Sequence, residues 1–494
     1  MGAYLLAIDQ GTSSSRTVIY DHAMSVVASA QQEFPQIYPQ PGWVEHDPEA
    51  IWDSVCAVTR KALHTAGIGA TDITAIGITN QRETTLIWDR ETGQCVHNAI
   101  VWQDRRTTRF CQELKDDGLE SLVADKTGLR LDPYFSATKI AWILDHVDGA
   151  RARAEAGKLA FGTVDCFLLW RLTGGKQHAT DATNASRTLL FNIHTQQWDD
   201  ELLKIFGIPR QLLPAVKDCA DDFGVGTDAC LGGEIPILGM AGDQQAALFG
   251  QAGLDDGMTK STYGTGCFVI ANTGAKVLHS EHRLLSTVAM RLDGEVTYGL
   301  EGSVFIAGSA MQWLRDEMQI IESVAESEAI AKRTGVVADV IVVPAFAGLG
   351  APYWDPEARG AILGLTRGSS RDQVITATLQ SVAYQTRDLI DAMADDGISP
   401  SVIRVDGGMV SNNWFLQFLA DILDITIERP VNIESTALGA AYLAACKADV
   451  ISGRDQIADY WHCESQFNPS MSQDQRKQLL DGWKSAVNRI RTNG

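Results

Sequence analysis

The sequence predicts an α/β protein made of two halves that have similar architecture and face a common cleft. A strand–turn–strand pattern around Gly11-Thr12 recurs around Gly264-Thr265, about half of the 494-residue chain further on. Short apolar runs that end in polar turns also alternate with longer helical patterns, which is typical of α/β folds. Ligands bind such sheets at the carboxyl ends of strands, so we expect a site where the two halves meet.

Each half is expected to begin with the same hairpin. In the first half, Tyr4 to Ile8 is apolar, residues 9–15 are rich in turn formers, and Thr17 to Tyr20 resumes β-branched and aromatic character. In the second half, Met258 to Tyr263 and Cys267 to Ala271 flank the turn Gly264-Thr265-Gly266. The two hairpins are therefore predicted to occupy equivalent places.

A second pair of strands gives weaker support to the repeat. Ile73 to Thr79 ends at Asn80-Gln81-Arg82-Glu83, and Val402 to Val405 ends at Asp406-Gly407-Gly408. The spacing of this pair differs from the spacing of the hairpins, so insertions of unequal length must separate the copies. We place the boundary near residue 250, within Phe249 to Gly253. This predicts an N-terminal domain over 1–250 and a C-terminal domain over 251–494.

Helical patterns fill the gaps between the strands. Gln373 to Met393 repeats apolar residues with a period near 3.6. Thr436 to Lys447 is rich in alanine, and Gly439 within it allows close packing. The apolar run Ile235 to Met240 leads through Ala241-Gly242-Asp243-Gln244-Gln245 into a helix expected at Ala246 to Phe249.

Composition and charge exclude several classes of protein. The chain has 41 basic and 62 acidic residues, a formal net charge of −21, and 45% hydrophobic residues. Such a chain is globular, and its negative surface repels phosphates, so no nucleic-acid partner is expected. The first ten residues lack a basic signal region, and no run approaches the roughly 18 apolar residues of a membrane helix. We therefore expect a cytoplasmic protein without membrane insertion.

The sequence motifs of several common enzyme classes are absent from this sequence. The P-loop pattern, the hydrolase elbow G-x-S-x-G and the zinc-protease motif H-E-x-x-H are all missing. The nine cysteines lie singly without a C-x-x-C motif, which favours reduced thiols over disulfides or a zinc site. The ten histidines are scattered, and we assign them to the surface or the core.

The first hairpin turn, Asp9-Gln10-Gly11-Thr12-Ser13-Ser14-Ser15-Arg16, combines a carboxylate, a glycine, several hydroxyls and a cation. Successive backbone N–H groups in such a turn form an anion-binding concavity, and hydroxyls add donors. Asp9 is placed to hold Mg²⁺ through water. A polar β-turn is the ordinary explanation for the stretch. The matching turn at Gly264-Thr265-Gly266 favours instead two opposed turns that clamp a polyphosphate.

Two further segments offer reactive or binding groups, each with an ordinary alternative. Asp243 is either a helix cap or a general base that accepts a hydroxyl proton during attack on phosphorus. Arg82 and Glu83 are either an exposed ion pair or a binding pair for a small substrate made mostly of hydroxyls, since arginine only donates and glutamate only accepts. Trp102 and Phe268 are candidate walls for the C–H faces of that substrate, although aromatic residues beside strands are usually core.

A series of motifs along essentially the whole chain resembles the FGGY family of carbohydrate kinases. The most specific are NQRETT at 80–85 and GLGAPYWDPEARG at 348–360. The others are DQGTSSSR at 9–16, VWQDRR at 101–106, YFSATKI at 134–140, GMAGDQQAALFG at 239–250, STYGTGCF at 261–268, GSAMQWLRD at 308–316, DGGMVSNNWF at 406–415 and ESTALGAAYLA at 434–444. The resemblance implies two RNase H-like domains, of the actin/hexokinase/Hsp70 ATPase type, that flank a catalytic cleft.

Within this family the motifs are most similar to those of members that phosphorylate glycerol. The resemblance implies in-line transfer of the γ-phosphoryl group of ATP, with Mg²⁺ at Asp9 and Asp243 as general base, to give sn-glycerol 3-phosphate in glycerol catabolism. The residues implied to hold glycerol are Arg82, Glu83, Trp102, Tyr134, Asp243, Gln244 and Phe268. Those implied to contact ATP are Thr12, Ser13, Ser14, Arg16, Thr265, Gly308, Gln312, Gly408 and Asn412.

The resemblance also implies a homo-oligomer, either a dimer or a tetramer. It does not extend to two ways in which members of the family are regulated. In some bacterial members an arginine in the glycine-rich loop before the GDQ segment helps to bind fructose 1,6-bisphosphate, whereas Glu234 stands in that loop here. Other members are activated by phosphorylation of a loop histidine, and residues 218–233 contain none. We therefore expect neither regulation by fructose 1,6-bisphosphate nor activation by histidine phosphorylation.

Two other functions stay open at this stage. One is a kinase of the same family that acts on a pentulose, gluconate or erythritol. The other is a nucleotide-driven chaperone or filament protein with the same fold, which needs no small-molecule pocket.

Overall fold

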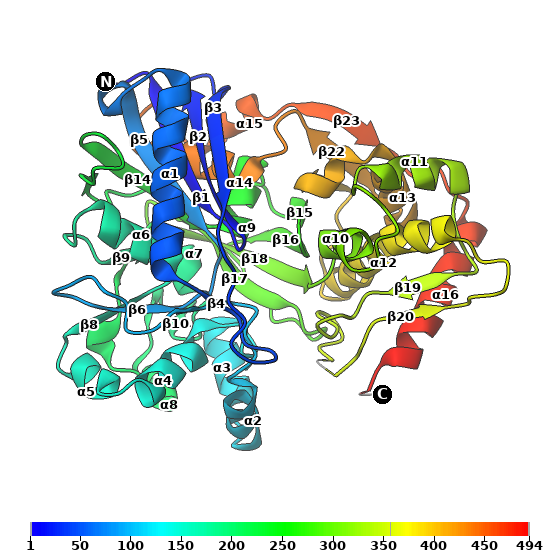
Figure 1. Ribbon diagram of the computed structural model, residues 1–494, viewed down its shortest axis with the longest axis horizontal. Helices are drawn as coiled ribbons and strands as arrows, with labels where there is room; N and C mark the ends of the chain where they lie inside the picture. Colours follow the sequence, from blue (N-terminus) through cyan, green and yellow to red (C-terminus); the bar gives the residue numbers. More distant parts are fainter. Residues whose placement is uncertain (1, 356, 493–494) are drawn as a thin grey trace.

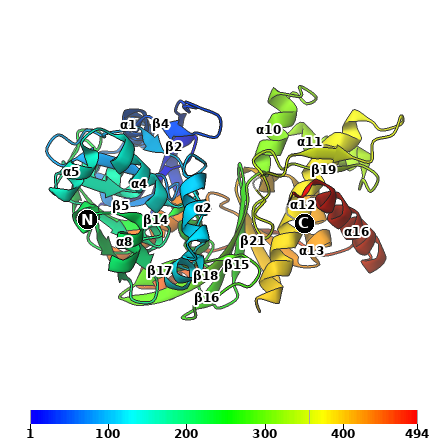
Figure 2. The ribbon, with the colours of Figure 1, turned by 90° about the horizontal axis from the view of Figure 1, so that it is seen from below.

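The computed structural model describes residues 2–355 and 357–492. Two large β-sheets organise the chain, and each forms the centre of one half of the molecule (Figure 1). Seen from below, strands of the second sheet lie between the N-terminal half and the helices of the C-terminal half (Figure 2).

The first sheet has six strands, all from the first half of the chain. In spatial order they are β13 (Val225–Gly226), β14 (Ile235–Gly242), β5 (Ile73–Asn80), β1 (Tyr4–Gln10), β2 (Ser14–Asp21) and β3 (Val26–Glu33). β1 is antiparallel to β2 and parallel to β5, which is in turn parallel to β14. The carboxyl ends of β1, β5 and β14 therefore lie side by side at one edge of the sheet.

The second sheet repeats this layout with one additional strand. In spatial order its strands are β17 (Leu285–Leu292), β18 (Glu295–Val304), β16 (Cys267–Gly274), β15 (Thr259–Tyr263), β21 (Val402–Asp406), β22 (Thr426–Pro430) and β23 (Cys463–Phe467). β15 is antiparallel to β16 and parallel to β21, as β1 is to β2 and β5. The predicted equivalence of the hairpins, and of the runs at 73–79 and 402–405, is confirmed.

Helices cover both faces of the first sheet. Leu6 and Ile8 of β1 share a core with α1 (Pro48–Ala66), whereas Leu5 and Ala7 share a core with α14 (Ser435–Lys447). Alternate residues of a strand point to opposite faces, so the two helices lie on opposite sides of the sheet. A strand that is covered on both faces reads as a continuous apolar run, which is how β1 appears in the sequence.

The second sheet is covered by α12 (Arg371–Asp395) and α13 (Asn413–Leu423), whose apolar residues share a core with β15, β16 and β21. α12 begins with a capping box, in which Ser370 and Gln373 each accept a hydrogen bond from the other's backbone N–H. The predicted helix over 373–393 is confirmed and extends further at both ends. The remaining elements of this half are α10 (Gly308–Asp316), α11 (Glu326–Thr334), β19 (Ile341–Val343), β20 (Ala361–Leu363), α15 (Ile457–Tyr460) and α16 (Gln473–Ile490).

α14 comes from the second half of the chain but packs on the first sheet and on α9 (Asp243–Gly250). A Cβ on Gly439 of α14 would lie 1.8 Å from the carbonyl oxygen of Ala246 in α9. A Cβ on Gly77 of β5 would lie 2.0 Å from the carbonyl oxygen of Ala440. The close packing predicted for Gly439 is confirmed, and the domain boundary near residue 250 stays a prediction.

Between β5 and β13 the chain leaves the sheet for residues 81–224, which form a block of helices and short strands, much of it in the lower left of Figure 1. Its helices are α2 (Thr108–Asp116), α3 (Glu120–Thr127), α4 (Ser136–His146), α5 (Ala150–Glu155), α6 (Val164–Leu172), α7 (Ala182–Ala185) and α8 (Asp200–Phe206). Its strand pairs are β6 (Leu86–Asp89) with β8 (Leu159–Gly162), β9 (Ala179–Asp181) with β12 (Ala215–Lys217), and β10 (Phe191–Asn192) with β11 (Gln197–Trp198), while β7 (Ala99–Ile100) pairs with the earlier β4 (Glu45–His46).

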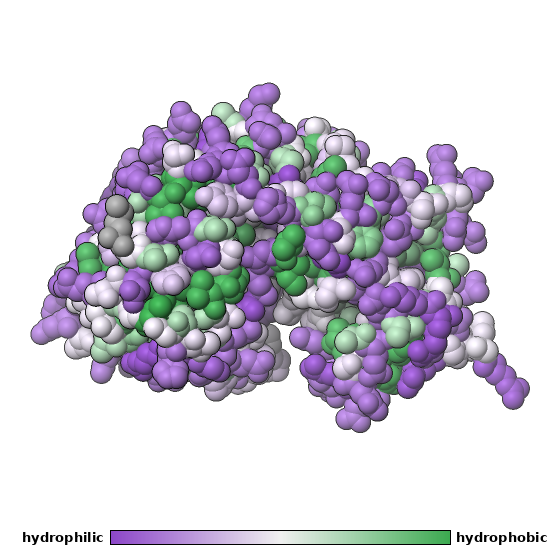
Figure 3. Space-filling model, turned by 90° about the horizontal axis from the view of Figure 1, so that it is seen from above, coloured by the Kyte–Doolittle hydropathy of each residue, from purple (hydrophilic) through white to green (hydrophobic). Residues whose placement is uncertain are grey.

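The surface agrees with the strongly acidic composition. The space-filling view shows mainly hydrophilic residues and a notch between the two halves (Figure 3). The nine cysteines, which all fall within the described ranges, carry free thiols. Among the residues that the structure describes, no helix is both long enough and apolar enough to cross a membrane.

We expect Gly439→Ala to destabilise the protein, because the added methyl group must push α14 away from α9. Overpacking of this kind costs about 1–3 kcal/mol. Urea unfolding followed by circular dichroism measures the effect. Gly368→Ala is the matched control, since Gly368 is exposed and a Cβ there would meet nothing closer than 3.8 Å. Equal midpoints for the two variants would show that α14 does not pack as described.

Candidate active site

The two predicted turns face one cavity of about 160 Å³. The turn between β1 and β2 contributes Thr12 and Ser13, and the turn between β15 and β16 contributes residues 264–266. All seven residues predicted to hold the substrate also line this cavity. The full lining is Thr12, Ser13, Arg82, Glu83, Trp102, Tyr134, Asp243, Gln244, Thr262, Gly264, Thr265, Gly266 and Phe268.

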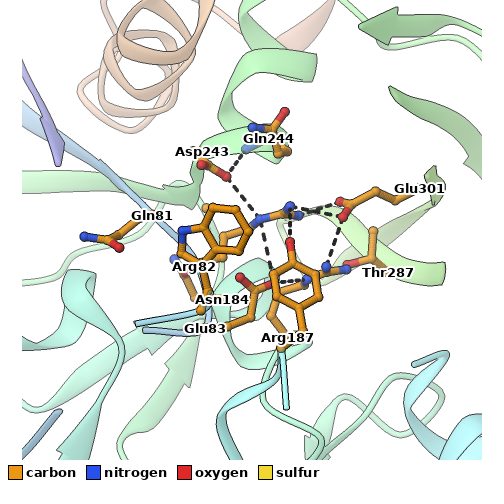
Figure 4. A network of polar contacts seen from close by, with 12 residues as sticks. Gln81, Arg82, Glu83, Asn184, Arg187, Asp243, Gln244, Thr287 and Glu301 are labelled. Atoms are coloured by element: carbon orange, nitrogen blue, oxygen red, sulfur yellow. Dashed lines mark hydrogen bonds and ion pairs between the residues drawn. The ribbon is translucent and has the colours of Figure 1, made fainter. Parts of the chain in front are cut away.

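Arg82 lies at the centre of the polar network in the cavity wall (Figure 4). Its side chain is only 2% exposed. Nη1 and Nη2 donate to Oε2 and Oε1 of Glu301 at 2.5 and 3.0 Å, while Nε lies 3.1 Å from Oδ1 of Asp243. A bidentate arginine–carboxylate pair fixes orientation as well as charge. Arg82 is therefore held with one edge toward Asp243.

Glu301 of β18 anchors this arginine from outside the cavity. Its side chain is fully buried and also accepts a hydrogen bond from Nη2 of Arg187 at 2.9 Å. Burial alone would raise the pKa of Glu301, but the guanidinium groups of Arg187 and Arg82 hold it at about 2. Sequence reasoning missed Glu301 and Arg187. The available signal for Glu301 was a charged residue near the middle of a strand, which needs a partner when buried.

Arg82 and Glu83 do not form the exposed ion pair that their adjacency suggests. Both are buried, and Nε of Arg82 lies 4.0 Å from Oε1 of Glu83. Glu83 instead accepts a hydrogen bond from Nε of Arg187 at 2.7 Å, and desolvation raises its pKa. Glu83 also has a φ of 57°, a left-handed conformation that is uncommon outside glycine and clusters at functional sites.

Asp243 is the first residue of α9, directly after β14. Gly242 occupies the N-cap position without a side-chain cap, and the carboxylate of Asp243 accepts a hydrogen bond from the backbone N–H of Gln244 at 2.7 Å. The side chain is 29% exposed and lines the cavity. Desolvation raises the pKa of Asp243, while Arg82 and Lys260 act in the opposite direction. This position suits a proton acceptor better than a helix cap.

Lys260 of β15 is a buried cation that sequence reasoning also missed. Its ammonium group donates to Oε1 of Gln244, and to Oγ1 of Thr262 at 2.8 Å. Burial lowers the pKa of Lys260 to about 8, and Asp406 and Asp243 oppose that shift. A positive charge therefore stands behind two residues of the cavity lining, where it can offset the charge of a bound anion.

Three aromatic rings form an apolar wall of the cavity. Trp102 makes edge-to-face contacts with Tyr134 and Phe268 at centroid distances of 5.6 and 6.1 Å. The indole N–H of Trp102 donates to Oγ1 of Thr12 at 2.9 Å, which joins this wall to the first turn. An apolar wall opposite a charged one suits a small molecule that carries both C–H and O–H groups.

Three residues predicted on the first hairpin lie outside the cavity lining. The hydroxyl of Ser14 accepts a hydrogen bond from a glutamine of β3, and Arg16 forms an ion pair with Glu434. Asp9 lies opposite Arg16 in the hairpin register. Desolvation, and then the neighbouring carboxylate of Asp243, raise the pKa of Asp9 to about 7. The ATP contacts of Ser14 and Arg16 stay predictions.

Four other residues predicted to contact ATP also lie outside this lining. Gly308 begins α10, and a Cβ there would lie 2.5 Å from the carbonyl oxygen of Gly264. Gln312 is exposed on the same helix. Gly408 has open space around its Cβ position, and Asn412 caps α13 through its side-chain oxygen. Gly308 thus has a steric role beside the second turn, and the contacts of all four with ATP stay predictions.

A larger surface groove of about 880 Å³, lined in part by Arg90, His97 and Arg171, contains none of the predicted site residues. Its size does not make it the active site. The two turns and the carboxylate with a raised pKa converge on the smaller cavity, and such convergence is the stronger indication of chemistry.

The fold and the cavity define a class of protein. Two repeated halves each present a hairpin turn of the kind whose backbone N–H groups bind anions. Between the turns, a carboxylate with a raised pKa and a buried arginine adjoin a small space. Such a site suits transfer of an anionic group to a hydroxyl. The class is that of two-domain phosphotransferases with the actin- and hexokinase-like fold.

Comparison with known proteins identifies the family. The models of the FGGY family of carbohydrate kinases match residues 4–250 with the N-terminal domain and residues 259–448 with the C-terminal domain. The chain belongs to the FGGY family of carbohydrate kinases. It is similar to glycerol kinase 1 of Pseudomonas aeruginosa, with 60% identity over 492 residues, and to the glycerol kinase of Ectopseudomonas mendocina, with 59% identity over 495 residues. Both alignments cover 100% of either chain.

Solved structures give the same result. The glycerol kinase of Plasmodium falciparum with ADP has a TM-score of 0.90 and 36% identity, over 99% of this chain and 98% of that chain. The gluconate kinase of Lactobacillus acidophilus has a TM-score of 0.87 and 22% identity over the same shares, and shows the common fold alone. The fold class and the family predicted from the sequence are confirmed.

We expect Glu301→Gln to destabilise the protein by about 3–5 kcal/mol, because it leaves Arg82 and Arg187 buried without their shared counter-charge. Urea unfolding of the wild type and the variant measures the difference. Glu317→Gln, at an exposed position after α10, is the matched control and should stay within about 0.5 kcal/mol of the wild type. A Glu301→Gln protein as stable as this control would contradict the described network.

Proposed function

We propose that this protein transfers the γ-phosphoryl group of ATP to glycerol and forms sn-glycerol 3-phosphate. The observation that carries this proposal is that both anion-binding turns, the Arg82–Asp243 pair and the aromatic wall open into one small cavity. The relatives at 60% and 59% identity are glycerol kinases, and so is the P. falciparum protein with ADP. These likenesses support glycerol as substrate and ATP as phosphoryl donor.

The size and lining of the cavity favour a very small substrate. Pockets for drug-sized ligands measure about 300–1,000 Å³, whereas this cavity measures about 160 Å³. Glycerol offers three hydroxyls on a short carbon chain, which matches charged groups on one wall and three aromatic rings on the other. A pentulose or gluconate would need a longer row of polar partners.

Asp243 acts as the general base in this mechanism. Its carboxylate lines the cavity and accepts the proton of the attacking hydroxyl as that oxygen approaches phosphorus. Arg82, 3.1 Å away, keeps the carboxylate oriented and donates to the substrate from a fixed position. A pKa raised by burial makes the carboxylate a stronger base than a free aspartate.

The two turns and Lys260 hold the phosphate groups. Phosphoryl transfer depends mostly on positioning and charge neutralisation. Thr12 and Thr265, each with a backbone N–H group and a hydroxyl, line the cavity from opposite halves. Lys260, behind Gln244 and Thr262, adds a buried positive charge. The triphosphate is thereby aimed at the hydroxyl beside Asp243.

The end of β1 fits a magnesium ion. Burial and the carboxylate of Asp243 raise the pKa of Asp9 to about 7, and a divalent cation relieves such repulsion between carboxylates. Mg²⁺ would be held by Asp9 through water, and it supplies charge neutralisation on the phosphates when bound.

Three further expectations stay predictions. They are the cytoplasmic location, the homo-oligomer and the division of the chain into domains over 1–250 and 251–494.

An assay of ADP release in the presence of ATP and Mg²⁺ tests the proposed function. We expect glycerol to stimulate ADP formation, sn-glycerol 3-phosphate to accumulate in equal amount, and kcat/KM for glycerol to exceed that for xylulose or gluconate. A higher value for one of those sugars would assign a different substrate. Thermal stabilisation by ATP without any turnover on polyols or sugars would point to a protein that is not a kinase.

We expect Asp243→Asn to lower kcat by about 10²–10⁴-fold while glycerol still binds, because the variant loses the general base but keeps a polar group of similar shape. Steady-state kinetics and calorimetry measure the two quantities separately. Asp53→Asn, at an exposed position on α1, is the control and should leave both unchanged. Turnover near the wild-type value would remove Asp243 from the mechanism.

The pH dependence of the rate provides a second test of the same residue. Only the ionised carboxylate accepts a proton, so kcat/KM falls as the pH drops through the pKa of Asp243. Burial raises this pKa, so kcat/KM should begin to fall at a pH above the usual pKa range of an aspartate. The residual kcat/KM of Asp243→Asn should not show this fall at low pH.

A further inference from the structure

Three side chains that are able to bind a metal converge at the edge of the first sheet, outside the active-site cavity. Cys56 belongs to α1, and Asp228 and Cys230 belong to the loop between β13 and β14. The two sulfur atoms and one carboxylate oxygen all lie within 4.8 Å of one another. None of the three residues lines the cavity between the turns.

The spacing of these atoms is close to that of a zinc site. Zinc binds cysteine sulfur at about 2.3 Å and carboxylate oxygen at about 2.0–2.2 Å, usually with tetrahedral geometry. Ligand atoms in such a site are therefore about 3.5–3.8 Å apart. The three atoms, which lie within 4.8 Å of one another, need to approach by about 1.3 Å at most to hold the ion.

The loop that carries two of the ligands is fixed by its own backbone. The N–H groups of Thr227 and Asp228 donate to the carbonyl oxygen of Leu172 at 2.8 and 3.2 Å. The N–H of Leu231 donates to the carbonyl oxygen of Asp228 at 3.0 Å, and the N–H of Cys230 donates to Oδ1 of Asp228 at 2.8 Å. The turn thus holds a carboxylate and a thiol on the same side, facing the helix that carries Cys56.

The two thiols are shielded from solvent. Cys56 and Cys230 are only 4% and 1% exposed. Cysteine binds a metal as the thiolate, so a divalent cation in this cluster supplies the positive charge that two buried thiolates need.

We propose that Cys56, Asp228 and Cys230 form a zinc-binding site, with water as the fourth ligand. Two sulfur ligands select zinc over magnesium or calcium, which prefer oxygen. Asp228 is less buried than the two cysteines, so water reaches the ion from its side. Binding releases the two thiol protons and ties the loop before β14 to α1, so the ion stabilises the N-terminal half and takes no part in phosphoryl transfer.

A cobalt titration tests this site. The full-length protein is reduced, freed of metal with a chelator, and titrated with Co²⁺ as a spectroscopic probe. We expect one equivalent to bind with a sulfur-to-cobalt charge-transfer band, and Zn²⁺ to displace it. The band should be lost in Cys56→Ser and in Cys230→Ser. Asp228→Asn, which can still accept the N–H of Cys230 and so preserve the turn, should bind more weakly.

Cys463→Ser is the matched control, because Cys463 is exposed and lies outside the cluster. It should keep the full band. Zn²⁺ should raise the Tm of the wild type and of this control but not of Cys56→Ser. The proposal is overturned by the lack of a charge-transfer band or by a band that survives both serine variants. These readouts are independent of kinase activity.

Discussion

Four buried charges at the junction of the two halves are the constraint on which the rest of the structure depends. Arg82 and Arg187 share Glu301, and Arg187 also pairs with Glu83, while each of these side chains is at most 2% exposed. A charge removed from water must be paired and hydrogen-bonded. β18 of the second sheet therefore has to meet the loop after β5 of the first sheet at one position. Within the first sheet, the parallel pairing of β5 and β14 places Asn80 beside Gly242 and so brings Arg82 close to Asp243.

In this network, the residues that orient Arg82 are different from the residue that faces the substrate space. Glu301 and Arg187 lie outside the cavity lining and fix the arginine from behind, so a ligand meets a guanidinium group that is already oriented. Asp243 is the more exposed partner and faces the open space. The hairpin turns of the repeated sheets approach the same space from opposite halves, because each turn follows the first strand of its sheet. A repeated fold thus yields one shared site.

Local patterns in the sequence predicted much of this arrangement. The strands around Thr12 and Thr265, the run that ends at Arg82 and the long helix α12 each carry their own periodicity and turn residues, so neighbouring residues suffice to find them. Contacts between distant residues leave no such signal: Glu301 lies 219 positions from Arg82, and the turn that carries Cys230 meets Cys56 only through the packing of α1. The sequence also left Asp243 with two roles. The structure favours the general base, because Gly242 occupies the N-cap position and the carboxylate of Asp243 lines the cavity.

A crystal structure with glycerol, Mg²⁺ and a non-hydrolysable ATP analogue tests the shared site most directly. We expect glycerol between the aromatic wall and Arg82, with one hydroxyl within hydrogen-bond distance of the Asp243 carboxylate. The terminal phosphate should lie between the turns at Thr12 and Thr265, in line with that hydroxyl. Turns that hold separate ligands, or an Asp243 carboxylate directed away from the bound polyol, would contradict a single site shared by the two halves.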